Sequence, residues 1–150
     1  MRLVSSLYLQ ALGWLIIAIL SCFICYQDIK VRKVRNDIVM VLAVVTCSLM
    51  TLTGNYTAVY VCLGIFLVGL LLTQVNVIAA GDIKLLMAFS LAIKPDLILL
   101  TFVVIGFTGG LLAVVYYLSI RMNKLSKQDN GIPYALPICF SGVLAIAASL

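Results

Sequence analysis

Long apolar runs separated by short polar turns make up most of the chain. Five runs are long, and they cover residues 3–26, 38–52, 58–72, 97–120 and 132–150. A sixth run is ambiguous, because its eleven residues at 83–93 are too few to cross about 30 Å of hydrocarbon at about 1.5 Å per residue. We therefore prefer a start at residue 77, which places Gly81 and Asp82 below the membrane surface. The pattern predicts an all-α fold, a polytopic membrane bundle of about six transmembrane helices that forms one domain over residues 1–150.

The composition agrees with a membrane protein and excludes an ordinary soluble one. Of the 150 residues, 65% are hydrophobic and 10% are charged, and the mean hydropathy is +1.25. Soluble domains have about 25% charged residues. A fold of this length has too little interior to hide so much apolar surface. The chemistry of the protein is therefore predicted to take place in the bilayer or at its edge.

Lysine and arginine predict the orientation of the bundle, because cytoplasmic loops carry the excess of these residues. Six alternating passes place eight of the ten basic residues on one side, in loops at residues 27–37, 73–84 and 121–131. Only Arg2 and Lys94 lie on the other side. The first side is therefore predicted to be cytoplasmic, with the N-terminus and the C-terminus outside. The net charge of +5 then reflects orientation and contact with membrane lipid, and no nucleic acid is expected as a partner.

The types of polar residue exclude several kinds of active site. The chain has no histidine, and its five acids are all aspartates. A Ser/His/Asp triad, a Cys/His dyad and a histidine-ligated zinc site are therefore excluded. Cys22 and Cys25 form a C-x-x-C pair, but the second pair that a tetrathiolate zinc site needs is missing. We interpret the five cysteines as buried thiols that pack as small hydrophobic groups, and we expect neither a metal nor an organic cofactor.

Two aspartates are predicted to meet at the cytoplasmic end of the bundle. Asp28 ends the first helix and Asp82 starts the fourth, so alternating passes bring both to one side. Two facing carboxylates share a proton, and the ionised one then activates water while the protonated one hydrogen-bonds a carbonyl, as in aspartic peptidases. Position alone leaves structural alternatives open, namely an N-cap at Asp82 and an ion pair of Asp28 with Arg32. Asp37 is interpreted as a first-turn acid of the second helix.

Three short motifs lie at the predicted helix junctions. They are Gly81, Asp82, Ile83, Lys84 and Leu85; Asp28 with Asn36 eight positions later; and Pro133, Tyr134 and Ala135 with Ile138 and Gly142. They resemble, in this order, the G-x-G-D-x-K-L, D-x(6)-P-N and P-Y-A-x-x-I-x-x-x-G patterns of the type IV prepilin peptidases, membrane aspartic peptidases of the GxGD class. The likeness covers nearly the whole chain.

This resemblance implies a function and a set of site residues. Asp28 and Asp82 would be the catalytic pair of an endopeptidase in a bacterial inner membrane. The enzyme would cut after the glycine that ends the basic leader of a prepilin or pseudopilin, on the cytoplasmic side. Gly81 would let the substrate backbone approach Asp82. Supporting or substrate-binding roles are expected for Lys84, Asn36, Pro133 and Tyr134. Lys84 would act as an anchor at the membrane interface or stabilise its loop. The start of the sixth helix would offer unpaired backbone groups to the substrate. The oligomeric state is left open.

Two departures from the family pattern qualify this expectation. Ala79 replaces the first glycine of the signature, which removes backbone freedom, and Arg35 stands where the family has proline. Three alternatives to a fully active peptidase follow from these departures: the enzyme is slower, its backbone differs locally, or the chain is an inactive homologue. The region with paired C-x-x-C motifs that accompanies methyltransferase activity in long members is missing. The chain therefore resembles the short, peptidase-only form found with tight-adherence (Flp-type) pili, and no N-methylation is expected.

Two other classes of function are alternatives to a peptidase. In a small transporter or channel, the same acids would relay protons or bind a cation. In a structural subunit of a pilus assembly machine, the aspartates would be dispensable. Gly106 and Gly110 would then be essential. They form a G-x-x-x-G pair, which is expected to let the fifth helix approach a neighbour closely. Cleavage of a prepilin and ion flux in proteoliposomes distinguish these classes.

Overall fold

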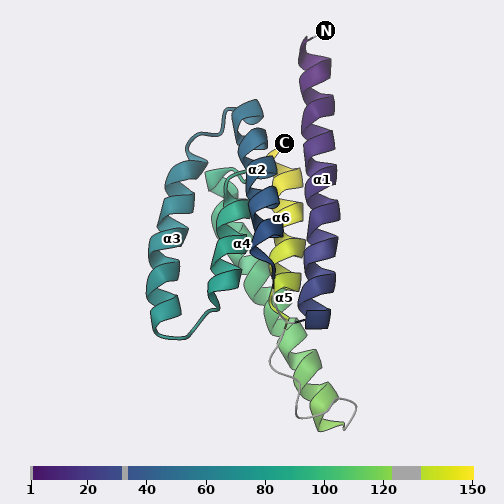
Figure 1. The fold of residues 1–150 in the computed structure, drawn as a ribbon, viewed down its shortest axis with the longest axis vertical. Helices are drawn as coiled ribbons and strands as arrows, with labels where there is room; N and C mark the ends of the chain where they lie inside the picture. Colours follow the sequence, from purple (N-terminus) through teal and green to yellow (C-terminus); the bar gives the residue numbers. More distant parts are fainter. Residues whose placement is uncertain (1, 32–33, 123–132) are drawn as a thin grey trace.

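The part of the chain that the structure describes is helical throughout, apart from short turns. The computed structural model describes residues 2–31, 34–122 and 133–150. Six helices occur in these ranges (Figure 1): α1 (Arg2–Val31), α2 (Asn36–Thr53), α3 (Ala58–Gln74), α4 (Ala80–Ser90), α5 (Pro95–Arg121) and α6 (Ala135–Ser149). The all-α prediction is confirmed. Three of the helices, α1, α2 and α5, are long and apolar enough to cross a membrane, whereas α3 and α6 are shorter apolar helices.

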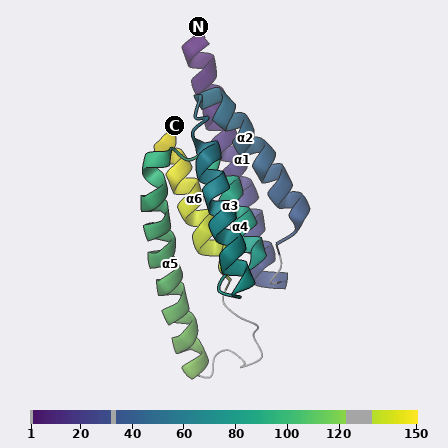
Figure 2. The ribbon, with the colours of Figure 1, turned by 90° about the vertical axis from the view of Figure 1, so that its left-hand side faces the viewer.

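Four helices form a closed ring, and two pack against its outside. In the ring, α1 contacts α2, α2 contacts α4, α4 contacts α6 and α6 contacts α1, while α3 lies on α4 and α5 on α6 (Figures 1 and 2). The end of α1 and the starts of α2, α4 and α6 lie at one end of the ring, and both chain termini lie at the other (Figure 1). Because α1 and α4 are diagonal members of the ring, side chains at their ends can face each other across it.

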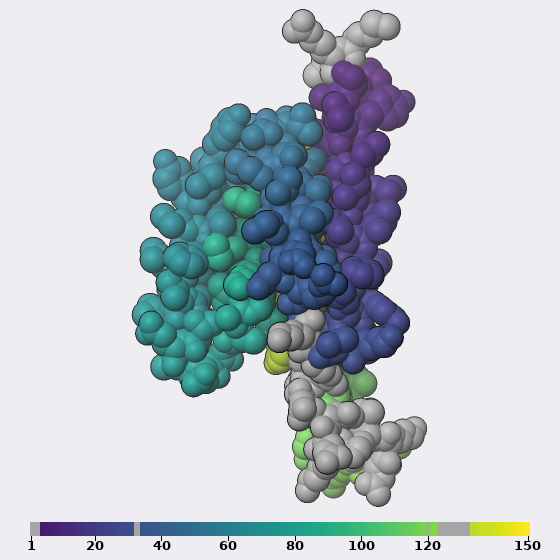
Figure 3. Space-filling view, viewed as in Figure 1, coloured from purple at the N-terminus to yellow at the C-terminus, as the bar shows by residue number. Residues whose placement is uncertain are grey.

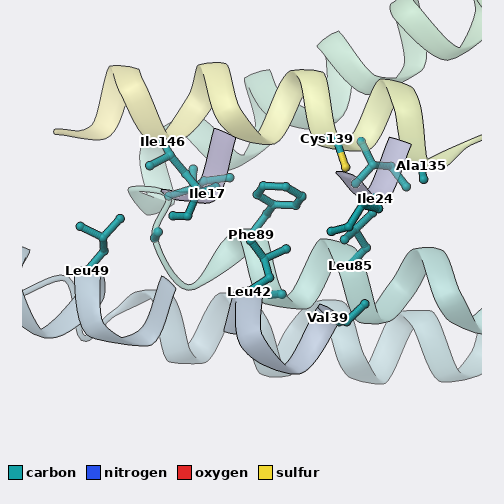
Figure 4. Packing of buried hydrophobic residues seen from close by; sticks show 14 residues of the cluster. Ile17, Ile24, Val39, Leu42, Leu49, Leu85, Phe89, Ala135, Cys139 and Ile146 are labelled. Carbon is teal, nitrogen blue, oxygen red and sulfur yellow. The ribbon is translucent and has the colours of Figure 1, made fainter. Parts of the chain in front are cut away.

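The interior of the ring is filled by large apolar side chains. Figure 4 shows the buried residues that α1, α2, α4 and α6 contribute, among them Ile17, Ile24, Leu42, Leu49, Leu85, Phe89, Cys139 and Ile146. By contrast, α3 buries only Ala58 and Gly69. The outer surface carries many exposed aliphatic and aromatic side chains. Hydrocarbon covers such a surface, whereas in water it would drive association.

The start of α4 differs from the prediction. Residues 77–79 are not helical, because Asn76 adopts a left-handed conformation with φ of 55° and Ala79 is extended, with φ of −71° and ψ of 140°. As a result α4 is too short to cross a membrane by itself, and Asp82 lies in its first turn. In addition, α1 continues past Tyr26 to Val31. The predicted polar loop at residues 121–131 and the predicted start of the last helix at residue 132 lie almost entirely outside the described residues.

The predicted close contact at Gly106 and Gly110 is wrong within this chain. A Cβ atom at either position would meet no atom within 4 Å, whereas a Cβ at Gly109 would lie 3.5 Å from Tyr134 and 3.8 Å from Pro137. The small residue of α5 that faces α6 is therefore Gly109.

Replacing both Gly106 and Gly110 with alanine is expected to leave the melting temperature in detergent unchanged or to raise it. The reason is that glycine inside a helix costs about 0.5–1 kcal/mol relative to alanine. Thermal unfolding measures this effect. Gly109→Ala serves as the comparison, because its added Cβ atom would contact Tyr134. A marked drop for the double variant would show that these glycines face a contact that the single chain does not contain.

Candidate active site

Asp28 lies near the end of α1, on the helix face that points into the ring. Ile24, one turn earlier, is fully buried, and Asp28 itself is only 9% exposed. The Oδ2 atom of Asp28 accepts a hydrogen bond of 3.2 Å from the backbone N–H of Ala135, the first residue of α6. A helix start presents N–H groups without intrahelical partners and a partial positive charge. The start of α6 therefore stabilises the Asp28 carboxylate and is itself tied to α1. Arg32, the alternative partner of Asp28, lies outside the described residues.

Asp82 lies diagonally opposite, in the first turn of α4. The predicted N-cap role of this residue is wrong, because the N-cap of α4 is Ala79. The backbone N–H of Asp82 donates to the carbonyl oxygen of Ala79 at 3.0 Å, which closes the first turn. Over the ranges that the structure describes, no hydrogen bond reaches the Asp82 side chain. Its carboxyl group is half-buried and thus open to a further partner.

Two observations place the two carboxyl groups near each other. Ile24, one turn before Asp28, and Leu85, three residues after Asp82, are both fully buried in the cluster that fills the ring (Figure 4). Residues three or four apart share a helix face, so both aspartates lie at the same end of the ring interior. In addition, the pKa of Asp82 is raised to about 6, first because burial disfavours its charged form and second because the nearby Asp28 charge repels it. The structure thus brings together the two residues that the sequence singled out.

The raised pKa of Asp82 predicts how stability changes with pH. Its folded value exceeds the unfolded value of about 4, so the stability that it contributes is complete below about pH 4 and is lost as the pH rises through 6. Asp82→Asn stays neutral and is therefore expected to raise the melting temperature near pH 8 but not near pH 4. Two pKa units correspond to about 2.7 kcal/mol, which partial exposure reduces to about 1–2 kcal/mol. Thermal unfolding in detergent checks this, and an equal effect at both pH values would contradict it.

Lys84 and Asn36 meet beside the aspartates. The Nζ atom of Lys84 donates to Oδ1 of Asn36 at 3.2 Å. This contact links the first two turns of α4 to the first residue of α2, and both side chains are exposed. The predicted roles of Lys84, as an anchor at the membrane interface or a stabiliser of its loop, stay predictions.

Two apolar grooves lead away from this end of the ring. One lies between α1 and α6 and has a volume of about 550 Å³, with Tyr26 and Phe140 among its walls. The other has a volume of about 480 Å³ and begins at Asn36 and Lys84. Figure 3 shows this second groove as a hollow in which α4 is visible between α2 and α3. Apolar side chains line most of both grooves, and neither aspartate is among the lining residues.

The residues before α6 differ in part from the prediction. Tyr134 has helical angles, with φ of −72° and ψ of −17°, and it is exposed, whereas Pro133 is half-buried. The predicted free backbone groups are not all free, because the N–H of Ala135 is bonded to Asp28. Sequence reasoning missed this contact. The only sequence signal for it is the place of Ala135 in the P-Y-A motif.

Two other predictions about polar residues can be compared with the structure. Asp37 lies in the first turn of α2, as predicted, and forms an exposed ion pair of 2.9 Å with Arg35. The buried-thiol interpretation is wrong for Cys22 and Cys47, which are exposed on the apolar outer surface. It holds for Cys139, which is buried. Neither Cys22 nor Cys47 therefore packs in the ring interior.

Ala79 does not strain the backbone before α4. Its φ of −71° and ψ of 140° lie in the extended region that any residue adopts. Gly81 also has no positive φ, and a Cβ there would meet no atom within 4 Å. The structure thus gives no backbone reason for a lower rate, and the space beside Gly81 is open to a partner molecule.

The variant Ala79→Gly, which restores the family signature, is expected to leave the activity of the protein close to that of the wild type. Its main effect should be a stability loss of about 0.4–1 kcal/mol, because glycine increases the freedom of the unfolded chain. Initial rates and thermal unfolding, measured on the same preparation, check both statements. A rate increase of tenfold or more would show that Ala79 does impair the site.

Comparison with known protein families matches residues 15–114 to the type IV leader peptidase family. The match covers two thirds of the chain and runs from α1 into α5, so it includes both aspartates, Gly81 and Lys84. Pro133 and Tyr134 lie beyond it. A search of curated proteins and a search of solved structures found no match.

Proposed function

The chain belongs to the type IV leader peptidase family, and from this premise we propose that it is a membrane aspartic endopeptidase that removes the leader peptide of prepilins or pseudopilins. The observation that carries the proposal is the approach of Asp28 and Asp82 to each other at one end of the ring. The substrate would keep a short basic leader in the cytoplasm and an apolar helix in the membrane. The short, tight-adherence type remains our hypothesis from the sequence motifs.

The proposed reaction requires one carboxylate, one carboxylic acid and one water molecule. One aspartate takes a proton from water while the other donates its proton to the oxygen of the scissile carbonyl, which gives a tetrahedral intermediate. The C–N bond then breaks, and the leaving nitrogen takes up a proton. No acyl-enzyme forms, because neither aspartate bonds to the substrate. Gly81 offers open space for the substrate backbone next to Asp82.

We propose that the end of the ring that holds the aspartates faces the cytoplasm of a bacterium, in the inner membrane. The proposal keeps six alternating passes with both termini outside, although α4 alone is too short to cross a membrane. In support, the end of α1 and the starts of α2, α4 and α6 lie at one end of the ring, as such passes require (Figure 1). The six passes place the first turn of α4, with Asp82, at the membrane boundary. The basic residues that the structure describes at this end, and that support the orientation, are Lys30, Arg35, Lys84 and Arg121. Arg32, Lys33, Lys124 and Lys127 lie outside the described residues.

A transporter or channel has less support from the ring interior. Behind the aspartates, the described part of the ring is packed with side chains such as Leu42 and Phe89. The buried hydroxyl groups of Ser21 and Thr46 donate to carbonyl oxygens of their own helices. An ion path needs polar groups that face a pore, so this interior favours chemistry at the membrane boundary.

The test is cleavage by the purified protein. The full chain and a prepilin would be reconstituted together in liposomes, and the masses of the products would be measured over time. The proposal expects one cut, and the mass of the mature product shows whether this cut follows the glycine that ends the leader. An intact prepilin, together with proton flux through the same liposomes, would support a transporter instead.

A further inference from the structure

The two aspartates have different surroundings, although the proposed mechanism treats them as equivalent. Asp28 is buried, and its Oδ2 accepts the N–H of Ala135 at 3.2 Å. That N–H belongs to the first turn of α6, where N–H groups lack intrahelical partners and the helix dipole is positive. Asp82 is half-buried, and among the described residues its side chain accepts no hydrogen bond. Donors that face a carboxylate favour its ionised form, whereas desolvation without donors favours the protonated form.

We infer that the first turn of α6 holds Asp28 as the carboxylate and leaves Asp82 as the group that carries the shared proton. The inference rests on the proposed function. It makes Asp28 the general base and Asp82 the general acid. Ala135 is then a positioning residue, which acts on Asp28 through its backbone N–H.

The other groups around Asp28 agree with this assignment. On α2, Arg35 pairs with Asp37 and is not paired with Asp28. Over residues 2–31, 34–122 and 133–150, no lysine or arginine forms an ion pair with Asp28. Among the described residues, Asp82 on α4, Cys25 on α1 and Cys139 on α6 are titratable groups that the charge of Asp28 affects. None of these three carries a positive charge, so the start of α6 is the feature of the described chain that offsets the charge of Asp28.

Each step of the reaction then has a defined direction. Asp28 accepts a proton from water while the water oxygen bonds to the scissile carbonyl carbon, and Asp82 donates its proton to the carbonyl oxygen. When the C–N bond breaks, Asp28 gives its proton to the leaving nitrogen and Asp82 regains one from a hydroxyl group of the intermediate. One water is added across one peptide bond, and both aspartates return to their starting states.

Infrared spectroscopy tests the assignment without a substrate, so its failure is distinct from a failure of the proposed function. Spectra of the wild type, Asp28→Asn and Asp82→Asn would be recorded in liposomes at several pH values, and bands common to all three proteins cancel on subtraction. The carbonyl band of a protonated carboxylic acid is expected to titrate near pH 6 in the wild type. In Asp28→Asn the band should still be present, but it should titrate at a lower pH than in the wild type. In Asp82→Asn the band that titrates near pH 6 should be missing. A band that is lost in Asp28→Asn and kept in Asp82→Asn would overturn the assignment.

A pair of variants tests the role of the Ala135 N–H. Ala135→Pro removes this donor at the first helical position, although proline disfavours the helical angles of the preceding Tyr134, and Ala135→Gly keeps the donor as a matched control. The proline variant is expected to lower kcat by about 10- to 100-fold, with KM unchanged and the acidic limb of the kcat profile moved to higher pH. The glycine variant should keep the wild-type profile. A proline variant with the wild-type pH profile would contradict the positioning role, and if this variant does not insert, the infrared comparison of the aspartate variants decides the assignment.

Discussion

Replacing Asp82 with asparagine is expected to lower the rate of leader removal by about 100- to 10,000-fold, the range for loss of a general acid or base. Asparagine has nearly the same shape, but it cannot exchange a proton with water or the substrate. Because no hydrogen bond within the described chain depends on the Asp82 side chain, the fold should be kept. The fraction of prepilin that is processed, followed by intact mass over time, measures the loss.

Asp37→Asn is the matched control for this variant. Asp37 and Asp82 both lie in the first turn of a helix, but Asp37 is exposed and pairs with Arg35. Its replacement removes the same charge from the same kind of position and should leave cleavage close to the wild-type rate. If Asp82→Asn and Asp37→Asn cleave equally well, Asp82 is not part of the catalytic machinery.

Gly142→Val should separate α4 from α6 and reduce both stability and activity. A Cβ at Gly142 would lie 2.6 Å from Cδ1 and 2.7 Å from Cγ of Phe89. The Phe89 ring is only 1% exposed, so a shift of the ring would press on the buried side chains around it. Overpacking of this kind costs about 1–3 kcal/mol. Because Asp82 lies on α4 and α6 positions Asp28, the same displacement should disturb the pair of carboxyl groups.

The expected result is a melting temperature lower by about 2–10 °C, together with slower cleavage although both aspartates are present. Gly110→Val is the matched control, since a Cβ at Gly110 meets no atom within 4 Å. Phe89→Leu in the Gly142→Val background should restore part of the lost stability by making room. Equal melting temperatures for Gly142→Val and Gly110→Val would contradict the packing of the ring.

The helices and the candidate pair could be predicted from the sequence for simple physical reasons. Apolar runs of nearly membrane-spanning length define the helices, and alternation along the chain brings Asp28 and Asp82 to one side. The start of α4 was missed because it depends on local backbone conformation, namely the left-handed Asn76 and the extended Ala79, which a count of apolar residues does not detect.

Tertiary contacts were less predictable than the helices. The hydrogen bond from Ala135 to Asp28 uses a backbone group and joins residues 107 positions apart, so no residue type indicates it. A glycine motif also does not show which face of its helix meets a neighbour. Gly106 and Gly110 face open space, while Gly142, the last residue of another motif, lies against Phe89.

The central claim is that Asp28 and Asp82 act as one catalytic unit, and a comparison of three variants tests it most directly. Leader removal would be measured in the same liposomes for Asp28→Asn, Asp82→Asn and the double variant. Groups that act as a unit are strongly non-additive, so the double variant should be no slower than the slower single variant. A single variant that cleaves at the wild-type rate, or a double variant that loses the product of the two separate losses, would contradict the claim.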